Sequence, residues 1–591
     1  MQRRIVLLGA GGVFAGLVLK GCGLASPAKQ PPANVISGLI DVHSHVFNGS
    51  DLPAVRFIKI VALQHFPRQA AKALDIENPD ALDGLLALLT AILGRTSAPS
   101  AADERAVLYG ELPSRAGNSD IAENETLVLE AIEAFHATAD SRARESAQGP
   151  VPAAPSGMSK GAAIAIADAL RAAAMQYEVP APAAPGSIPS PSSEAEKAYR
   201  SNTNLGVYLR WFALFTRYRY VLAADLAAAH RRQGFEPLLL CPATVDFDFW
   251  LGEYVRTSPM PDQVAVMGAL ARRKTGPVVH GYVGFDPLRQ AYFNSGKFLD
   301  YDPLGLVRRA IRDEGFVGVK LYPPMGFKAI GNEADRCQTY HKRIVDELAA
   351  GAPDDPTTAG CNPRPGAGSR TIGRKLDEAM TALFDLCVAE SACVLAHANH
   401  TNDSGEGYAK RADPAYWLPV FRTPRWRTLR VGLAHFGHFT TQSEAAPSGT
   451  VGTEASWEWS LGRFIKEAGD PPVFADVSYL TEIMQKPEHE MSGYVEIFQR
   501  WMNEFDPECR HLMFGTDWTM LAMESSYEVY TQSVYAFFRD KCRLDRARLD
   551  RLYFRNAARF LGLRAGDAAR DRLLTFYAKN NIPASRLPLV S

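Results

Sequence analysis

The sequence predicts an α/β fold, a (β/α)8 TIM barrel with a large helical insertion after the first strand. Three observations predict it. Eight short apolar runs end in polar or Gly/Pro residues, segments with helical apolar spacing lie between most of them, and the chain of 591 residues is long enough for a barrel of about 250 residues with additions. Strands that alternate with helices form a parallel sheet, and eight such units close into a barrel.

The predicted strands are unevenly spaced along the chain. They are residues 38–43, 237–245, 277–285, 316–322, 393–397, 429–435, 472–478 and 511–517. Helical spacing of apolar residues occurs at 304–312, 374–389, 457–466 and 494–505. We therefore expect the barrel to comprise residues 36–50 and 205–565, followed by a C-terminal tail at 566–591. The long gap after the first strand predicts an insertion, residues 51–204.

The insertion has its own pattern. Residues 82–93, 123–137 and 161–177 have helical spacing, whereas residues 179–193 are rich in Pro, Ala and Ser and predict a flexible linker. The segment 208–230 is aromatic and apolar at helical spacing, which predicts a packed helix. A second insertion, residues 328–370, carries Gly, Pro and Asp punctuation and follows the fourth strand.

The N-terminus resembles an export signal. The basic pair Arg3-Arg4 precedes an apolar run, residues 5–19, that is short for a bilayer span. The sequence Leu19-Lys20-Gly21-Cys22 resembles a bacterial lipobox, although Lys20 departs from that pattern, and the arginine pair also resembles a twin-arginine signal. We expect a signal or lipoprotein segment at 1–22, a tether at 23–35 and a cell-envelope location, periplasmic or membrane-anchored through a lipidated Cys22. An uncleaved membrane anchor is the alternative.

Charge and cysteine content exclude some classes of protein. Lys plus Arg is 64 and Asp plus Glu is 65, so the net charge of −1 disfavours a basic nucleic-acid-binding domain. The cysteine spacing matches no thiolate zinc site. Cys337 and Cys361 lie in a Pro/Gly-rich region and would form a disulfide in an oxidising compartment, with free buried thiols as the alternative.

Polar residues end four of the predicted strands. In Asp41-Val42-His43-Ser44-His45, the two imidazoles stand two residues apart on an extended segment and project to the same side. His397, His435 and Asp517 end three further runs. In a barrel the carboxyl ends of the strands converge on one mouth, so this pattern predicts a metal centre. Imidazoles with one carboxylate suit Zn²⁺, while Mn²⁺, Co²⁺ and Fe²⁺ are alternatives. A packed histidine pair and a helix N-cap at Asp517 are the structural alternatives.

These residues resemble the amidohydrolase superfamily. The sequences FVGVKLYP from Phe316, GTDW from Gly515 and NAARFLGL from Asn556 are similar to its amidohydrolase-related branch, which includes aminocarboxymuconate semialdehyde decarboxylase. The similarity covers about residues 36–48 and 236–563. It implies a distorted (β/α)8 barrel. It also implies a divalent metal held by His43, His45, His397 and Asp517, with His435 as acid/base and Asp517 also orienting the attacking water.

Lys320 lies on or near the fourth predicted strand. In two-metal branches of the superfamily, a carboxylated lysine there bridges the ions, and His397 and His435 hold the second metal. The surrounding motifs are closer to the one-metal branch, and binding of a substrate carboxylate is the other role open to Lys320. His400 and His438 contact either substrate or loop backbone, and His280 is expected to pack in its strand. The candidate lining residues are Tyr322, Asn399 and Trp518.

The expected function is therefore a metal-dependent hydrolase that acts on a C–N or C–O bond of a small molecule. A metal-dependent decarboxylase of a conjugated or aromatic acid is the first alternative. A non-catalytic envelope protein that binds a ligand is the second, which the intact set of site residues disfavours.

Overall fold

The computed structural model describes residue 36 and residues 38–588, apart from 54–80, 97, 113–117, 145–158, 178–192, 253–256, 298–299, 354, 401–402, 406, 447–451 and 525–526. The expected signal segment, the tether and nearly all of the predicted flexible linker lie outside these residues. Within the described part of the chain, no helix combines the length and the apolar character needed to cross a bilayer.

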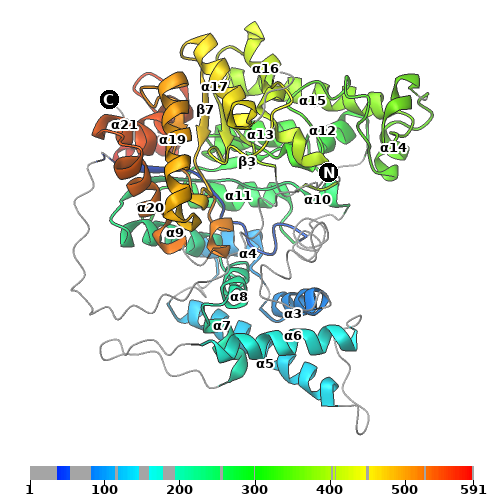
Figure 1. The fold of residues 1–591 in the computed structure, drawn as a ribbon, viewed down its shortest axis with the longest axis vertical. Helices are drawn as coiled ribbons and strands as arrows, with labels where there is room; N and C mark the ends of the chain where they lie inside the picture. Colours follow the sequence, from blue (N-terminus) through cyan, green and yellow to red (C-terminus); the bar gives the residue numbers. More distant parts are fainter. Residues whose placement is uncertain are drawn as a thin grey trace. The chain divides into compact units, whose positions relative to one another are not determined.

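The chain divides into two compact units (Figure 1). Of the described residues, the helical unit contains those within Phe47–Leu222 and Thr519–Tyr527. The α/β unit contains those within Asn34–Val46, Ala223–Trp518 and Glu528–Ser591. The boundary crosses one helix, α9 (Arg219–Arg232).

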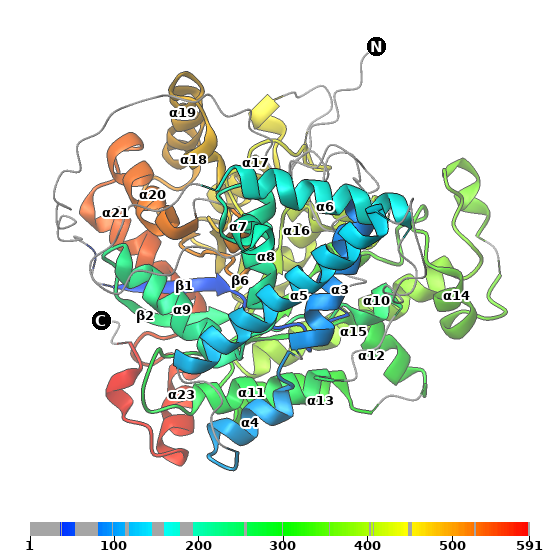
Figure 2. The ribbon, with the colours of Figure 1, turned by 90° about the horizontal axis from the view of Figure 1, so that it is seen from below.

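The helical unit is built on three long helices that lie side by side (Figure 2). Its helices are α3 (Ala81–Thr96), α4 (Ala101–Leu108), α5 (Asn118–Arg144), α6 (Lys160–Met175), α7 (Glu194–Arg200) and α8 (Asn204–Leu214). Hydroxyl side chains cap α4, α6, α7 and α8 at their N-termini. The segment 208–230, predicted to be a packed helix, is helical and largely buried, but it is divided, because α8 ends at Leu214 and α9 begins at Arg219. The hydroxyl of Thr216 donates to the carbonyl of Ala213 at 2.8 Å, a local bond that competes with helix continuation.

The α/β unit contains a strand at each of the eight predicted runs, with β1 ending one residue beyond its run, and all pairs are parallel. They are β1 (Leu39–Ser44), β2 (Pro237–Pro242), β3 (Tyr282–Gly284), β4 (Gly318–Leu321), β5 (Cys393–His397), β6 (Val431–Ala434), β7 (Val473–Asp476) and β8 (Leu512–Met513). One sheet pairs β1 with β2, and the other runs in the order β3-β4-β5-β6-β7-β8. The fold is therefore mixed α/β with parallel sheets. Isolated bridges join Leu240 to Val279, Ala243 to Tyr282, and Ser44 to Trp518.

Helices connect successive strands of the larger sheet. The helices of this unit that follow α9 are α10 (Asp248–Leu251), α11 (Met260–Ala271), α12 (Pro287–Asn294), α13 (Pro303–Asp313), α14 (Lys342–Leu348), α15 (Ser369–Ala389), α16 (Leu418–Arg422), α17 (Trp457–Ala468), α18 (Glu482–Gln485), α19 (Glu488–Phe505), α20 (Tyr530–Ala536), α21 (Arg546–Asp550), α22 (Asn556–Leu561) and α23 (Ala568–Lys579). Asp286 and Asp302 each precede a proline and accept the amide of the second helical residue, which starts α12 and α13. The region predicted as a C-terminal tail contains α23, whose Leu573, Phe576 and Tyr577 join the buried core.

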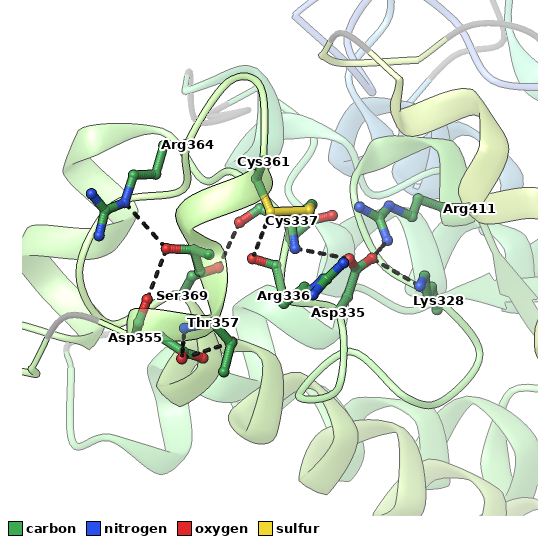
Figure 3. Close-up of a disulfide and its surroundings, with 12 residues drawn as sticks. Lys328, Asp335, Arg336, Cys337, Asp355, Thr357, Cys361, Arg364, Ser369 and Arg411 are labelled. Atoms are coloured by element: carbon green, nitrogen blue, oxygen red, sulfur yellow. Dashed lines mark hydrogen bonds and ion pairs between the residues drawn. A yellow bond between two sulfur atoms is a disulfide. The ribbon is translucent and has the colours of Figure 1, made fainter.

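The second insertion, between β4 and α15, contains a disulfide (Figure 3). Cys337 and Cys361 are joined with an S–S distance of 2.02 Å, so the disulfide alternative of the sequence analysis is confirmed. Near it, Asp335 accepts from Lys328 at 2.8 Å and also pairs with Arg411. The free cysteines among the described residues are buried.

Candidate metal centre

The end of β1 and the segment after β8 bring His43, His45 and Asp517 together. One ligand atom from each residue lies within 4.8 Å of the other two. Asp517 Oδ1 is 3.4 Å from His43 Nε2 and 3.2 Å from His45 Nε2. All three residues are buried. The close approach depends on Gly515, since a Cβ atom at that position would lie 2.9 Å from the Cβ of His43.

The contacts of Nδ1 on His43 and His45 determine which nitrogen of each ring carries the proton and which faces the carboxylate of Asp517. His45 Nδ1 lies 3.1 Å from the carbonyl oxygen of Ala243, which can only accept, so Nδ1 carries the proton of the neutral ring. His43 Nδ1 lies 3.3 Å from the carboxylate of Asp476, with the same consequence. Each Nε2 lone pair is therefore directed toward an oxygen of Asp517. Three buried acceptors that face one another are unfavourable without a cation, and this donor set fits a divalent ion of the zinc type.

Burial and neighbouring charges shift the pKa values of His45, His397, His435 and Asp517. Burial lowers the pKa of His45 and outweighs the contact with Asp517. Burial also lowers the pKa of His397, and it lowers that of His435 to about 3. For Asp517, burial opposes ionisation, but the surrounding imidazoles, His435 first, lower the pKa below its ordinary value. These shifts favour neutral imidazoles at His45, His397 and His435 and an ionised carboxylate at Asp517.

Lys320, on β4, lies at the same centre. Its Nζ is 2.8 Å from His43 Nε2, so the lysine donates to a lone pair that a metal ion would also use. Lys320 is buried, and burial lowers its pKa to about 8 despite the nearby carboxylates of Asp517 and Asp476. A lysine in this position is close enough to take part in cation binding or in substrate contact.

His397 and His435 form the next part of the site. The His435 ring centroid is 4.9 Å from that of His43 and 4.6 Å from that of His397. The His397 ring also stacks on Tyr322 at 4.3 Å. His397 does not belong to the three-residue ligand group found among the described residues. The structure thus gathers three of the four predicted ligands directly and places the fourth beside His435.

Two site residues have left-handed backbone conformations. The φ angles are 68° at His435 and 58° at Asp517, a region that residues other than glycine rarely occupy. Hydrogen bonds hold both: the His435 amide donates to Asp476 Oδ1 at 3.2 Å, and the Asp517 amide donates to the His43 carbonyl at 2.7 Å. The local strain directs the two side chains into the site.

Asp476 and Ser478, at the end of β7, are site residues that the sequence analysis missed. Both are completely buried, and the Ser478 hydroxyl lies 2.9 Å from His43 Nδ1 and 3.1 Å from His435 Nδ1. For Asp476, burial opposes ionisation, but His43 and further polar contacts lower the pKa below its ordinary value. The available signal was the same as at Asp517, namely a carboxylate where an apolar run ends.

Asp41 is a second group whose role the sequence did not reveal. Its carboxylate accepts from the Thr516 amide at 3.0 Å and from the Thr516 hydroxyl at 2.7 Å, which fixes the segment that carries Asp517. His230 Nε2 lies 3.2 Å from the same carboxylate. His230 comes from α9, far from Asp41 in the sequence, so only the fold reveals this contact.

The remaining candidate residues have other surroundings. His438 Nδ1 lies 2.6 Å from Glu482, and its Nε2 is 3.4 Å from the side-chain nitrogen of Asn399. The ring of His400 packs beside Trp457, with centroids 6.3 Å apart. His280 is completely buried between the Gly315 carbonyl and the Tyr577 hydroxyl, although it lies just before β3 and not within it. Trp518 is buried and bridges to Ser44 through its backbone.

A pocket beside Lys320 has mainly apolar walls. Its aromatic and sulfur-containing lining comes from Phe247, Phe285, Tyr322, Met325 and Phe327. Asp246 also lines it, but Arg289 holds that carboxylate with two bonds of 3.0 and 2.5 Å. The cavity has a volume of about 10 Å³, about the space of one water molecule, and its walls are apolar and aromatic in character.

Comparison with known proteins gives few matches. No family model and no curated protein matches the sequence. Two crystal structures of an amidohydrolase from Burkholderia multivorans are similar, one with bound HEPES and one with bound zinc. These structural neighbours are amidohydrolases. Each is 13% identical and covers 61% of this chain and 91% of the other, with TM-scores of 0.34 and 0.32. Similarity at this level shows nothing about the site.

Proposed function

We propose that the chain is a metal-dependent hydrolase of the amidohydrolase superfamily that cleaves a C–N or C–O bond in a small molecule. The observation that carries the proposal is the convergence of two imidazole lone pairs and one carboxylate oxygen within 4.8 Å, from residues near opposite ends of the described chain. Without a cation, a buried group of two imidazole lone pairs and a carboxylate would not stabilise the fold.

The proposal includes a distorted (β/α)8 barrel that residues 51–204 interrupt. In support, bridges link the β1–β2 pair to β3 on one side, and Ser44 to Trp518, just after β8, on the other. The amides of Thr516 and Asp517 also donate to the His43 carbonyl. A closed barrel would bring the carboxyl ends of all eight strands to one mouth, where such sites lie.

In the proposed mechanism, His43, His45 and Asp517 hold one divalent cation, with Zn²⁺ expected from the nitrogen and oxygen ligands. When bound, the cation supplies Lewis-acid polarisation of the scissile group and lowers the pKa of water. His435 contacts the reacting group of the substrate, where it transfers a proton or stabilises negative charge. Lys320 orients a substrate oxygen, and His397 stands beside His435 on the substrate side.

In the proposal, the substrate body lies against Phe247, Phe285, Tyr322, Met325 and Phe327, whose side chains must move apart to enlarge a pocket of about 10 Å³. One wall of that pocket is Lys320, which contacts His43, so a group held there has one end at the metal centre. Aromatic esters, lactones and amides are therefore the first compounds to test.

The direct test is elemental analysis of the purified protein, followed by turnover on a panel of aryl esters, lactones and amides. We expect about one zinc per chain and loss of turnover on chelation, with recovery when zinc is restored. A protein without stoichiometric metal, or with turnover unaffected by chelation, would contradict the proposal.

A decarboxylase is the second candidate, because a buried lysine beside an aromatic-lined pocket also suits a conjugated carboxylic acid. Release of carbon dioxide from aromatic or muconate-type acids, without hydrolysis of any compound in the panel, would favour this alternative.

Export is proposed as the location, with Cys22 lipidated. In support, the disulfide between Cys337 and Cys361 suits an oxidising compartment. Cell fractionation of the full chain and of a Cys22→Ser variant tests this, with loss of membrane association expected only in the variant.

A further inference from the structure

Ser478 lies between two histidines of the site. Its hydroxyl oxygen is 2.9 Å from His43 Nδ1 and 3.1 Å from His435 Nδ1, and the three residues are buried. A serine hydroxyl carries one proton, so it can donate to one of these nitrogens while it accepts from the other. The arrangement therefore couples the tautomers of the two rings.

Asp476 decides the direction of this coupling. Its carboxylate oxygens lie 3.3 and 3.4 Å from His43 Nδ1, and an ionised carboxylate can only accept. His43 Nδ1 therefore carries the proton and donates toward Ser478 and Asp476. The Ser478 hydroxyl is then left to donate to His435 Nδ1.

This assignment also determines whether Nε2 of each ring carries a proton. Neutral His43 has its lone pair on Nε2, the nitrogen that faces Asp517 and Lys320. Neutral His435, whose Nδ1 accepts from Ser478, carries its proton on Nε2. The competing arrangement protonates His435 at Nδ1, which would then donate to the Ser478 carbonyl oxygen at the longer distance of 3.4 Å.

We propose that Ser478, directed by Asp476, is a positioning residue that holds His43 and His435 in opposite tautomers. His43 is held as a metal ligand through Nε2, and His435 is held as a hydrogen-bond donor through Nε2. On the proposed function, His435 then stabilises the oxygen that gains negative charge, and it does not act as the initial base. The oxygen class that it recognises is a carbonyl or leaving-group oxygen of the substrate.

The test uses metal-free full-length protein labelled with ¹⁵N-histidine. Long-range ¹⁵N–¹H correlation spectra assign the protonated nitrogen of each neutral ring, and His43→Gln and His435→Gln variants identify the signals. We expect the proton on Nδ1 of His43 and on Nε2 of His435. A neutral His435 protonated at Nδ1 in the unmutated protein overturns the proposal, whether or not any hydrolase activity is found.

Two variants at Ser478 separate positioning from simple packing. Ser478→Ala is expected to move the His435 proton to Nδ1, and Ser478→Thr, which keeps the hydroxyl, is expected to restore the original tautomer. Ser460→Ala, at another buried serine, is the matched control and should leave both rings unchanged. An unchanged His435 tautomer in folded Ser478→Ala also overturns the proposal. If that variant does not fold, the spectrum of the unmutated protein alone decides.

Turnover gives an independent measurement if the proposed function holds. With zinc restored, Ser478→Ala is expected to lower kcat about 10- to 100-fold, and Ser478→Thr to recover most of it. If the protein proves not to be a hydrolase, turnover cannot be measured, but the tautomers can still be assigned. Failure of the proposed function and failure of the tautomer proposal are therefore distinguishable.

Discussion

Two buried clusters of charged and polar side chains, one in each unit of the molecule, are built differently. In the helical unit, Arg219 donates to Asp51 Oδ2 at 3.0 Å and to Glu104 Oε2 at 2.7 Å. Asn48 and Ser50 accept further bonds from the same guanidinium. In the α/β unit, imidazoles surround the carboxylate of Asp517, and the nearby cation, Lys320, is directed at an imidazole nitrogen.

The difference shows how a structural cluster can be told from a functional one. The Arg219 cluster contains its own permanent cation with matched hydrogen-bond geometry, so it needs nothing from outside. The cluster at Asp517 consists mainly of converging acceptors; Lys320 donates to one of them, His43 Nε2, and an added cation would satisfy the others. Burial alone does not distinguish them, since both are buried.

The largest expected effect is loss of metal. His43→Ala and Asp517→Ala should each lower zinc affinity and turnover by about 100-fold or more, because each removes a ligand atom from the three-residue group. His397→Ala, outside that group, should keep zinc affinity within about tenfold. Titration with zinc and a competing chelator measures this. Equal loss of zinc in all three variants would place His397 among the ligands instead.

Arg219→Met should destabilise the helical unit by about 3–5 kcal/mol, because it leaves Asp51 and Glu104 buried without their cation. Denaturant unfolding measures this, and zinc content should be unchanged. Arg95→Met, which breaks the exposed pair with Glu130 in the same unit, is the control and should cost less than about 1 kcal/mol. Similar losses for both variants would show that the Arg219 cluster has no special structural role.

The disulfide between Cys337 and Cys361 should also stabilise the protein, by a covalent link and not by metal binding or ion pairing. The double variant Cys337→Ser/Cys361→Ser should lose about 3 kcal/mol, since the bond closes a loop with a sequence separation of 24 residues. Unfolding with and without reductant measures this. The reductant should destabilise only the unmutated protein, and a variant as stable as that protein would rule out this contribution.

The smallest expected effect within a single pH unit is a pH dependence of the metal-free protein. His435 has a folded-state pKa of about 3 against an ordinary value of 6.5, so the unfolded chain binds the extra proton between these values. Stability should be complete above pH 6.5 and fall as the pH decreases toward 3, by about 1.4 kcal/mol per pH unit for this residue. The lowered pKa of Asp517 acts only below its ordinary value of 3.8 and does not enter this window from 6.5 to 4.

The measurement is unfolding free energy against pH, with His435→Asn expected to have a smaller slope between pH 6.5 and 4. His489→Asn, at a largely exposed histidine, should keep the slope of the unmutated protein. Equal slopes in all three proteins would show that His435 is not held neutral by burial.

The sequence by itself determined where the strands lie along the chain, and it identified three residues that the structure brings together as candidate metal ligands. The eight apolar runs and their polar ends are local patterns, and His43, His45 and Asp517 could be predicted from them because strand alternation and strand termination are short-range features. Helix breaks were less predictable, since the division of the segment 208–230 depends on a few hydrogen bonds near Thr216.

Only the tertiary structure decided which polar residues meet. Asp476 and Ser478 end a strand just as Asp517 follows one, yet their contacts with His43 and His435 depend on the packing of β7 beside β8 and β6. The position of Lys320 against His43, and of His397 beside His435 and outside the ligand group, likewise depends on distances of a few ångströms between strands. Sequence patterns specify which side chains are available at the strand ends, whereas hydrogen-bond geometry, which sets tautomers and ligand sets, exists only once the strands are packed.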